Sequence, residues 1–365
     1  MNSLKLLQNY GPLDRLLHRL AFRSGGMQTV LADMEDSMYR SAIESIPVEY
    51  PVLITALPRA GTTLLLELLY ATGEFASHTY RQMPFVLCPL LWNKLSGGFR
   101  SAESKWMQRA HDDGMEISLD SAESFEEIIW RRYWPNQYQA DRILPWTHCS
   151  DGEFDEFLGN HLRKILYLAN PEEPSTLRYL SKNNGNIARL DCLQETFSRP
   201  LALVPFRDPA GHAASLHRQH LRFRELHRSS RFALDYMRGI GHFDFGDNLL
   251  PIDFDGWLDQ PGVNEAGQVE FWLNYWIATY RNVLERQSGN TLLFDYNRLV
   301  ESPAVSLGVM AEATGIRHAD ALVNQADRVR KTGTAQKNKE NLDVDRALIA
   351  EALEVHAQLR DQSVN

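Results

Sequence analysis

An apolar strand that runs through a broken turn into a helix is the feature that most constrains the fold of this 365-residue chain. Residues 52–57 (VLITAL) have the length of a buried strand, residues 58–61 interrupt it, and the following LLLELLYAT predicts a helix that ends at Gly73. A strand that enters a helix through a tight turn presents free backbone N–H groups at the positive end of the helix. The segment therefore predicts an anion site at the start of this helix.

The same order of elements returns later in the chain. Residues 201–206 (LALVPF) form a second apolar run, Arg-Asp-Pro follows, and a helix is expected over about 210–220. A third strand, 291–294 (TLLF), follows a helical stretch at about 268–287 and precedes another helix. Pro205 cannot donate to a neighbouring strand, so we expect it at the end of its strand. This alternation predicts an α/β fold in three layers, with a P-loop-like central parallel sheet flanked by helices.

The sequence predicts three regions. Residues 1–45 show helical periodicity and are expected to form an N-terminal helical segment that packs on the domain. Residues 46–340 form the main α/β domain, and residues 341–365 are expected to form a C-terminal helix. Residues 82–180 differ from the rest of the main domain because they are helix-rich, acidic and rich in tryptophan. We therefore treat 82–180 as an insertion into the α/β domain.

The charge is unevenly distributed. The net charge of −9 argues against a nucleic-acid partner, which selects for basic surfaces. Residues 199–231 nevertheless hold seven arginines against two acids, and residues 328–339 hold five cations and no acid. Solvated basic helix faces would explain each segment alone. Two such segments in an acidic protein favour a local anion site.

The three cysteines, Cys88, Cys149 and Cys192, are odd in number and lack the spacing of metal ligands. They are typical of a reducing compartment, and no disulfide framework is expected. No window approaches 18 uninterrupted apolar residues, so no membrane span is predicted. The N-terminus shows no secretory leader pattern. These features predict a soluble, cytoplasmic protein.

The turn after the first strand reads ALPRAGTTL and has the chemistry of a phosphate-binding loop. Gly61 lets the backbone approach an anion, Thr62 and Thr63 add hydroxyl donors, and Arg59 offers a planar, permanently charged fork. The loop of nucleoside triphosphatases requires G-x-x-x-x-G-K-[ST], and here Thr62 stands in place of the lysine. A threonine-capped helix after a turn is the simpler alternative for the motif alone.

The motif PRAGTT resembles the 5′-phosphosulfate loop of sulfotransferases that use 3′-phosphoadenosine 5′-phosphosulfate (PAPS), usually written P-[KR]-[SA]-G-[ST]-[ST]. That family binds the 3′-phosphate with an arginine at a strand end and a serine eight residues later, and Arg207 and Ser215 have this spacing. A C-terminal R-K-x-G loop of the family is similar to residues 330–333 (RKTG). The resemblance implies PAPS as co-substrate. The site it implies consists of Arg59, Ala60, Gly61, Thr62, Thr63, Arg207, Ser215, Arg330 and Lys331.

Sulfuryl transfer to a hydroxyl needs a base for the acceptor proton and cations for the developing charge. No metal is required by this logic, and no metal-ligand cluster is visible in the sequence. Branches resembling trehalose and tyrosylprotein sulfotransferases place a glutamate after the first helix, where this chain has His78. We predict His78 as the base because imidazole titrates near neutrality. His111 is the alternative, by resemblance to the downstream histidine of cytosolic sulfotransferases, and Lys182 and Arg59 are the predicted catalytic cations.

The resemblance places the acceptor-binding and lid segments in residues 82–180. A sugar, a phenol or a lipid-like molecule would offer the hydroxyl. Residues 112–127 hold seven acids without a lysine or arginine, and we expect them to repel an acidic acceptor. The helical spacing of Trp130 and Trp134 is more typical of a core than of an aromatic platform. A P-loop kinase or nucleotide hydrolase, and a catalytically silent nucleotide-binding protein, are the alternative functions.

Overall fold

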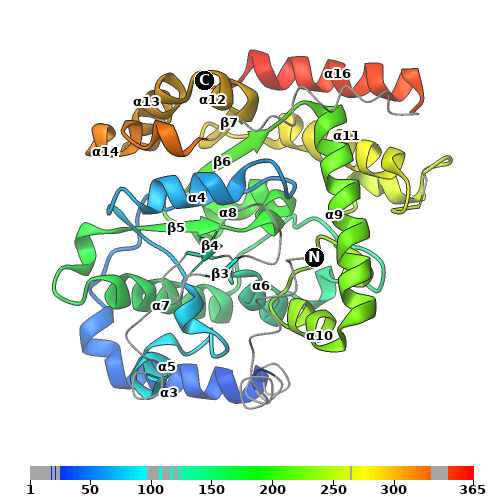
Figure 1. Ribbon diagram of the computed structural model, residues 1–365. Coiled ribbons are helices and arrows are strands. Elements are labelled where there is room, and N and C mark those ends of the chain that lie inside the picture. The colour runs from blue at the N-terminus through cyan, green and yellow to red at the C-terminus, as the bar shows by residue number, and fades with distance from the viewer. Residues whose placement is uncertain are drawn as a thin grey trace.

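A parallel β-sheet lies at the centre of the chain in a computed structural model, which describes residues 18, 21, 25–96, 107–108, 116–117, 122–123, 125–263, 265–329 and 344–365 (Figure 1). Within the described residues this sheet has five strands in the order β2-β5-β1-β6-β7, and every neighbouring pair of strands is parallel. The predicted α/β class with a central parallel sheet is confirmed. The strands are β1 (Val52–Ile54), β2 (Phe75–Ala76), β5 (Arg178–Lys182), β6 (Leu201–Phe206) and β7 (Thr291–Asp295); β3 (Met107–Gln108) and β4 (Glu116–Ile117) form a separate antiparallel pair.

Helices cover both faces of the sheet. Successive side chains of a strand point to opposite faces, and apolar side chains on both faces pack against helices. Val52 and Ile54 of β1 join one apolar cluster with α4 (Thr62–Tyr70) and α13 (Pro303–Thr314). Leu53 points the other way and joins the larger cluster, to which α7 (Gly152–Ala169) and α11 (Val269–Arg286) contribute. Figure 1 shows α4 and α7 on opposite sides of the sheet. The result is the three-layer arrangement that the alternating sequence predicts.

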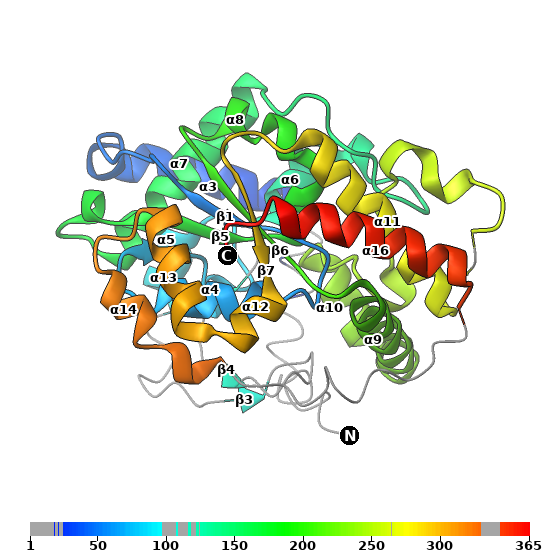
Figure 2. The ribbon, with the colours of Figure 1, turned by 90° about the horizontal axis from the view of Figure 1, so that it is seen from above.

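Long helices close the side of the sheet next to β7. Helix α11 packs against α9 (Pro209–Ser229) and against α16 (Arg346–Asp361), and Figure 2 shows α16 beside α11. At the other end, α3 (Gly25–Ile43) packs against α7 and α5 (Pro89–Ser96). Further α-helices in the described residues are α6 (Glu127–Tyr133), α8 (Leu193–Thr196), α10 (Arg231–Gly239), α12 (Tyr296–Glu301) and α14 (Ala319–Val323). The 3-10 helices include η1 (Tyr80–Gln82), η4 (Asn184–Cys192) and η5 (Gly246–Asn248).

Pro205 lies at the penultimate position of β6, near the strand end where the sequence analysis placed it. On one side β6 pairs with β7 through this residue, in register with Phe294. On the other side β1 has already ended at Ile54, which pairs with Leu203. The missing N–H of Pro205 therefore removes no bond to β1, because no strand partner stands there.

Cys149 and Cys192 form a disulfide, with their Cα atoms 5.3 Å apart. The expectation of no disulfide was wrong, because the spacing of cysteines in the sequence does not reveal that the segment before α7 meets the end of η4. Cys88 has a buried free thiol, and burial raises its pKa to about 12. Within the described ranges, no helix combines the length and apolar character needed to cross a membrane.

Candidate active site

The candidate site residues gather at the carboxyl ends of the parallel strands. The loop 55–61 follows β1, Lys182 ends β5, Arg207 follows β6, and Tyr296 follows β7. In open parallel sheets, ligands bind outside this edge, where neighbouring strands send their chains to opposite faces. The order of the sheet puts β1 between β5 and β6, so the loop lies between the other two candidate segments.

The loop after β1 has an unusual backbone. Arg59 has φ +70° and Gly61 has φ +100°, both in the left-handed region, and α4 begins at Thr62. A Cβ at residue 61 would lie 2.3 Å from Cδ2 of Tyr296. Glycine is therefore required at this position for two reasons, the backbone conformation and the close approach of the Tyr296 ring. No motif in the sequence places Tyr296 at this loop.

A buried histidine, His212, forms a hydrogen bond to the backbone of the loop. His212 of α9 donates from Nε2 to the carbonyl oxygen of Pro58 (2.8 Å), and its Nδ1 accepts from Trp276 Nε1–H of α11 (3.2 Å). Burial, followed by the charge of Arg207, lowers the pKa of His212 to about 3. The imidazole is therefore neutral with its proton on Nε2. Two helices thus fix the position of Pro58 in the loop.

The two predicted phosphate-binding elements meet directly. Arg207 donates from Nη1 to the carbonyl oxygen of Arg59 (2.9 Å), and Arg59 donates from Nε to Oγ of Ser215 (3.4 Å). The Arg207 guanidinium lies over the Tyr296 ring, 5.1 Å from its centroid. The structure therefore brings Arg59, Ser215 and Arg207 into one cluster, as their motifs predict.

The charge of Arg207 is only partly offset by a neighbouring acid, because burial lowers its pKa more than the charge of Asp208 raises it. Among the described residues it forms no ion pair, and its Nε–H is shielded from solvent without a hydrogen-bond partner. Burial is the first cause that lowers its pKa. A shielded guanidinium is costly unless an anion meets it. This cluster is therefore suited to bind an anionic group.

A buried lysine and a buried glutamate meet beside the loop. Lys182 pairs in register with Ile54 at the end of β1, and its Nζ lies 3.5 Å from Oε1 of Glu123. The hydroxyl of Tyr80 donates to Oε2 of the same carboxylate (2.6 Å). The backbone N–H of Glu123 donates to the carbonyl oxygen of His78 (2.9 Å), which fixes this segment. The sequence did not single out Glu123, because it is one of seven acids in the run 112–127 and no motif marks it.

His78 lies in the core of the protein with 2% of its surface exposed. Its Nδ1 is 3.2 Å from the hydroxyl of Tyr179, which donates to Glu126, so Nδ1 must carry the proton. Its Nε2 then accepts from Nε2–H of His161 (2.7 Å). Burial lowers the pKa of His78 to about 4. Both ring nitrogens are therefore occupied by protein groups.

Three acids of the run 112–127 point inward. Glu123, Glu126 and Glu127 have 9% or less of their surface exposed. Glu127 accepts a hydrogen bond from Arg189, whose guanidinium lies 4.0 Å from the ring centroid of Trp130. These three residues are not part of a solvated acidic surface, because each carboxylate accepts hydrogen bonds inside the protein.

Three predicted site residues, His111, Arg330 and Lys331, lie outside the described residues. Within the part of the chain that the structure describes, no group of three or more histidine, cysteine, aspartate and glutamate side chains is arranged to hold a metal ion. The candidate site described above consists of Arg59 to Thr63, Lys182, Arg207, Ser215 and, in addition to the predictions, Tyr80, Glu123 and Tyr296.

Comparison with solved structures finds sulfotransferases. The chain is similar to sulfotransferase STF1 from Mycobacterium tuberculosis H37Rv, with 12% identity over 93% of this chain and 96% of that chain and a TM-score of 0.45. It is similar to sulfotransferase STF9 from Mycobacterium avium, with 13% identity, coverage of 90% and 80%, and a TM-score of 0.45. The sulfotransferase domain from the curacin biosynthetic pathway has 12% identity, coverage of 87% and 99%, and a TM-score of 0.40. No protein-family model and no curated protein matches. At these TM-scores we draw no residue role from the neighbours.

Proposed function

We propose that this protein is a sulfotransferase that moves the sulfuryl group of PAPS to a hydroxyl acceptor and releases adenosine 3′,5′-bisphosphate (PAP). One observation carries the proposal. The shielded Arg207 guanidinium has no ion-pair partner among the described residues, and it is bonded to the loop whose Arg59 contacts Ser215. An arginine held in this way between two phosphate-binding motifs needs an anion.

The loop after β1 and the segment from Arg207 to Ser215 are proposed to bind different parts of PAPS. The backbone N–H groups at the start of α4, with the hydroxyls of Thr62 and Thr63, hold the 5′-phosphosulfate. Arg207 and Ser215 hold the 3′-phosphate, and the resemblance adds Arg330 and Lys331 to the same group. Bound PAPS supplies an activated sulfuryl group. The residues of this chain position the donor and stabilise the negative charge that develops during transfer.

Lys182 is proposed to stabilise the negative charge that develops during transfer. It is buried at the end of β5, beside the end of β1 that leads into the loop. A preorganised cation in a site shielded from water stabilises developing charge far more than a cation in water does. Arg59, whose Nε donates to Oγ of Ser215, is proposed to stabilise the same charge.

The proton acceptor is proposed to be Glu123. Its carboxylate lies against Lys182 and is oriented by the hydroxyl of Tyr80. His78 has both ring nitrogens engaged in the core, which suits a residue that positions its neighbours. Glu123 is therefore preferred to His78 as the group that takes the acceptor proton. His111 stays an alternative for this role.

The acceptor is proposed to be a small molecule, a glycan or a lipid-like molecule with a free hydroxyl. Trp146 and Trp130 are buried beside Arg189, so these two tryptophans do not form an open platform for it. The kinase or hydrolase alternative requires a lysine where the loop has Thr62. The silent nucleotide-binding alternative predicts binding of PAP without transfer.

One experiment separates these functions. The purified protein is titrated with PAP and, separately, with ATP–Mg²⁺, and the melting temperature is followed. A ligand that binds the native state raises this temperature by mass action, and PAP is expected to give the larger shift. Transfer of ³⁵S from PAPS to a fractionated cell extract then tests catalysis. A larger shift with ATP–Mg²⁺ would contradict the proposed donor, and binding of PAP without transfer would favour the silent protein.

A further inference from the structure

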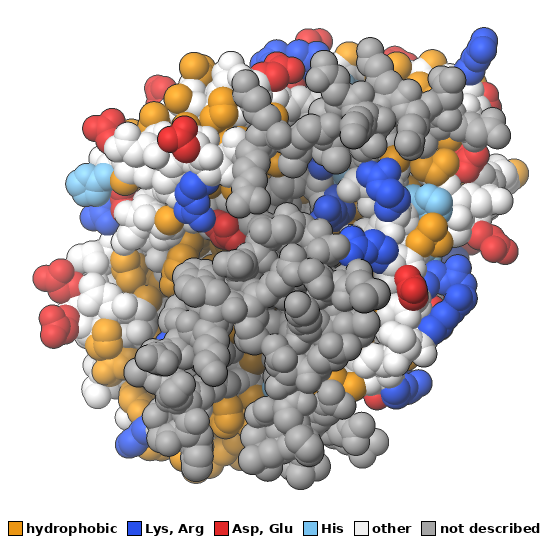
Figure 3. Space-filling model, viewed as in Figure 1, with side chains coloured by type: hydrophobic (Ala, Val, Ile, Leu, Met, Phe, Trp, Pro, Cys, Tyr) orange, Lys and Arg blue, Asp and Glu red, His pale blue; other side chains and the backbone are white. Residues whose placement is uncertain are grey.

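The outer face of α9 is rich in arginine beyond the candidate nucleotide site. Arg218 and Arg228 are exposed and Arg224 is half-exposed, and they span ten residues, or about 15 Å of helix. Figure 3 shows Lys and Arg side chains gathered over α9. Ser215 belongs to the same helix, and Arg218 is close enough to Arg207 to lower its pKa. The basic face therefore begins beside the candidate site and leads away from it.

These arginines are weakly engaged by the protein itself. Arg218 and Arg228 form no hydrogen bond or ion pair within the described ranges, and Arg224 approaches Asp247 only at 3.9 Å. A guanidinium stays charged at any physiological pH and presents several donors in a plane. Because no acid of the described residues neutralises Arg218 or Arg228 by direct contact, their donors face solvent.

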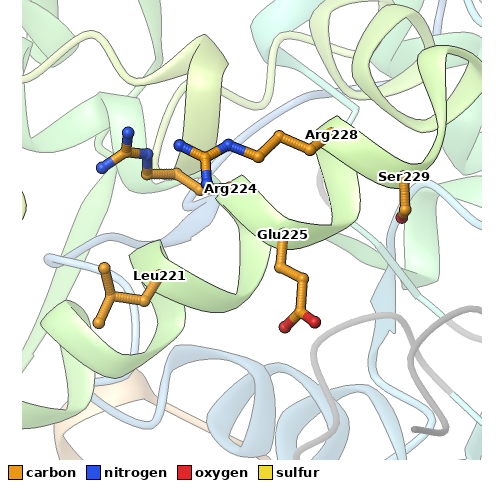
Figure 4. A pocket seen from close by; sticks show the side chains of 5 residues that line it. All are labelled: Leu221, Arg224, Glu225, Arg228 and Ser229. Atoms are coloured by element: carbon orange, nitrogen blue, oxygen red, sulfur yellow. The ribbon is translucent and has the colours of Figure 1, made fainter.

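An open pocket lies on the same helix. Figure 4 shows Arg224 and Arg228 extending side by side, while Leu221 and Glu225 project from a neighbouring side of the helix; Ser229 completes the lining. Leu221 has 43% of its surface exposed. The pocket therefore combines two cations with an apolar side chain, and one carboxylate interrupts the positive charge.

We propose that this α9 face, formed by Arg218, Leu221, Arg224 and Arg228, is a docking surface for an acidic, amphipathic segment of a partner protein. The partner's carboxylates meet the arginines and its apolar side chains meet Leu221. An acidic polysaccharide or a nucleic acid fits less well, because it offers Leu221 no apolar counterpart. A surface of this kind steers an acidic partner towards the neighbouring site.

The probe is a fluorescein-labelled helical peptide of 14 residues that carries Glu and Leu on one face. Its binding to the full chain is measured by fluorescence anisotropy at low and at high salt. Arg224→Glu/Arg228→Glu is expected to weaken binding on the order of tenfold, because two attractions become repulsions. Arg40→Glu/Arg346→Glu alters the net charge equally at exposed positions on α3 and α16 and is expected to change little.

Leu221→Ser separates the two kinds of acidic partner. It should weaken the peptide but leave the binding of a heparin-derived octasaccharide unchanged. The proposal is overturned if both double variants weaken the peptide equally, or if Leu221→Ser has no effect on it. Stronger binding of the octasaccharide than of the peptide would also overturn it, since the face would then serve a polyanion. PAP titration of each variant checks the nucleotide site, so the docking surface and the proposed function can fail separately.

Discussion

Arg207 donates a hydrogen bond from Nη1 to the backbone carbonyl oxygen of Arg59, at 2.9 Å. This bond joins the end of β6 to the loop that follows β1, two segments that are 148 residues apart. Any anion that Arg207 binds is therefore held in a fixed relation to the start of α4. A substitution of Arg207 therefore removes a hydrogen bond to the loop as well as a contact to the ligand.

Arg207→Ala is expected to weaken PAP on the order of a hundredfold, because a charge-assisted contact to phosphate is lost. Adenosine 5′-phosphosulfate lacks the 3′-phosphate, so its affinity should fall much less. Isothermal titration of both ligands measures the difference, and Arg199→Ala, at an exposed position, is the control. Equal losses for both ligands would show that Arg207 acts only through the loop.

Gly61→Ala should lower both the stability and the affinity for PAP. Alanine is strained at φ +100°, and its Cβ would collide with the Tyr296 ring. The cost in unfolding free energy is expected to be about 1 to 3 kcal/mol. Urea unfolding measures it. Adding Tyr296→Ala removes the collision but leaves the strained φ, so only part of the loss should return. Full recovery would show that the backbone conformation is unimportant.

Glu123→Gln should lower turnover by about 10²- to 10⁴-fold while PAP still binds, because the amide takes no proton. The transfer of ³⁵S from PAPS gives the turnover. His78→Gln is the matched variant in the neighbouring network, and it should affect stability more than turnover. If His78→Gln abolishes turnover and Glu123→Gln does not, the base is His78. Loss of activity in His111→Gln alone would move the role to that residue.

Lys182→Met should reduce turnover by roughly 10²-fold or more with a small change in PAP affinity, since the cation acts mainly on the transition state. Methionine keeps the length of the side chain. Single-turnover kinetics, compared with PAP titration, separates the two effects. A parallel loss of affinity and turnover would instead make Lys182 a residue that binds the donor.

The buried histidines predict a loss of stability in mild acid. Burial lowers the pKa of His78 to about 4, below the value near 6.5 expected in the unfolded chain. Between these values the unfolded state binds the extra proton, so the unfolding free energy falls as the pH drops from about 6.5 to about 4. His78 alone should account for about 3 kcal/mol. Urea unfolding at a series of pH values tests this. The slope of the unfolding free energy against pH measures how many more protons the unfolded state binds, and His78→Gln should lower that number by about one. An unchanged slope would contradict the assignment.

The sequence predicted the strands that are continuous apolar runs. Residues 52–57 and 201–206 could be identified because both faces of these strands are covered by helices. Strand β5 was missed, because its sequence RYLSK has only two apolar residues and is neither a continuous apolar run nor an alternating one. Its polar members are buried by partners from distant segments: Ser181 donates to Glu126, and Lys182 meets Glu123.

The same limit applies to the site. Arg59, Ser215 and Arg207 stand in local motifs of fixed spacing, so the sequence could place them on their elements. Glu123 and Tyr296 reach the site only through tertiary packing, and no local pattern marks them. A run of acids is ordinarily a solvated surface, and only the structure shows which carboxylates turn inward.

The contact between Gly61 and the Tyr296 ring has a consequence for the order of folding. The two residues are 235 positions apart, so the contact closes a loop that is longer than half of the chain. Such long-range contacts are entropically expensive and form late. Nucleotide binding should therefore appear only after β7 has joined the sheet. A nascent chain released before residue 296 would lack the ring that packs on the loop, however well its first strands had folded.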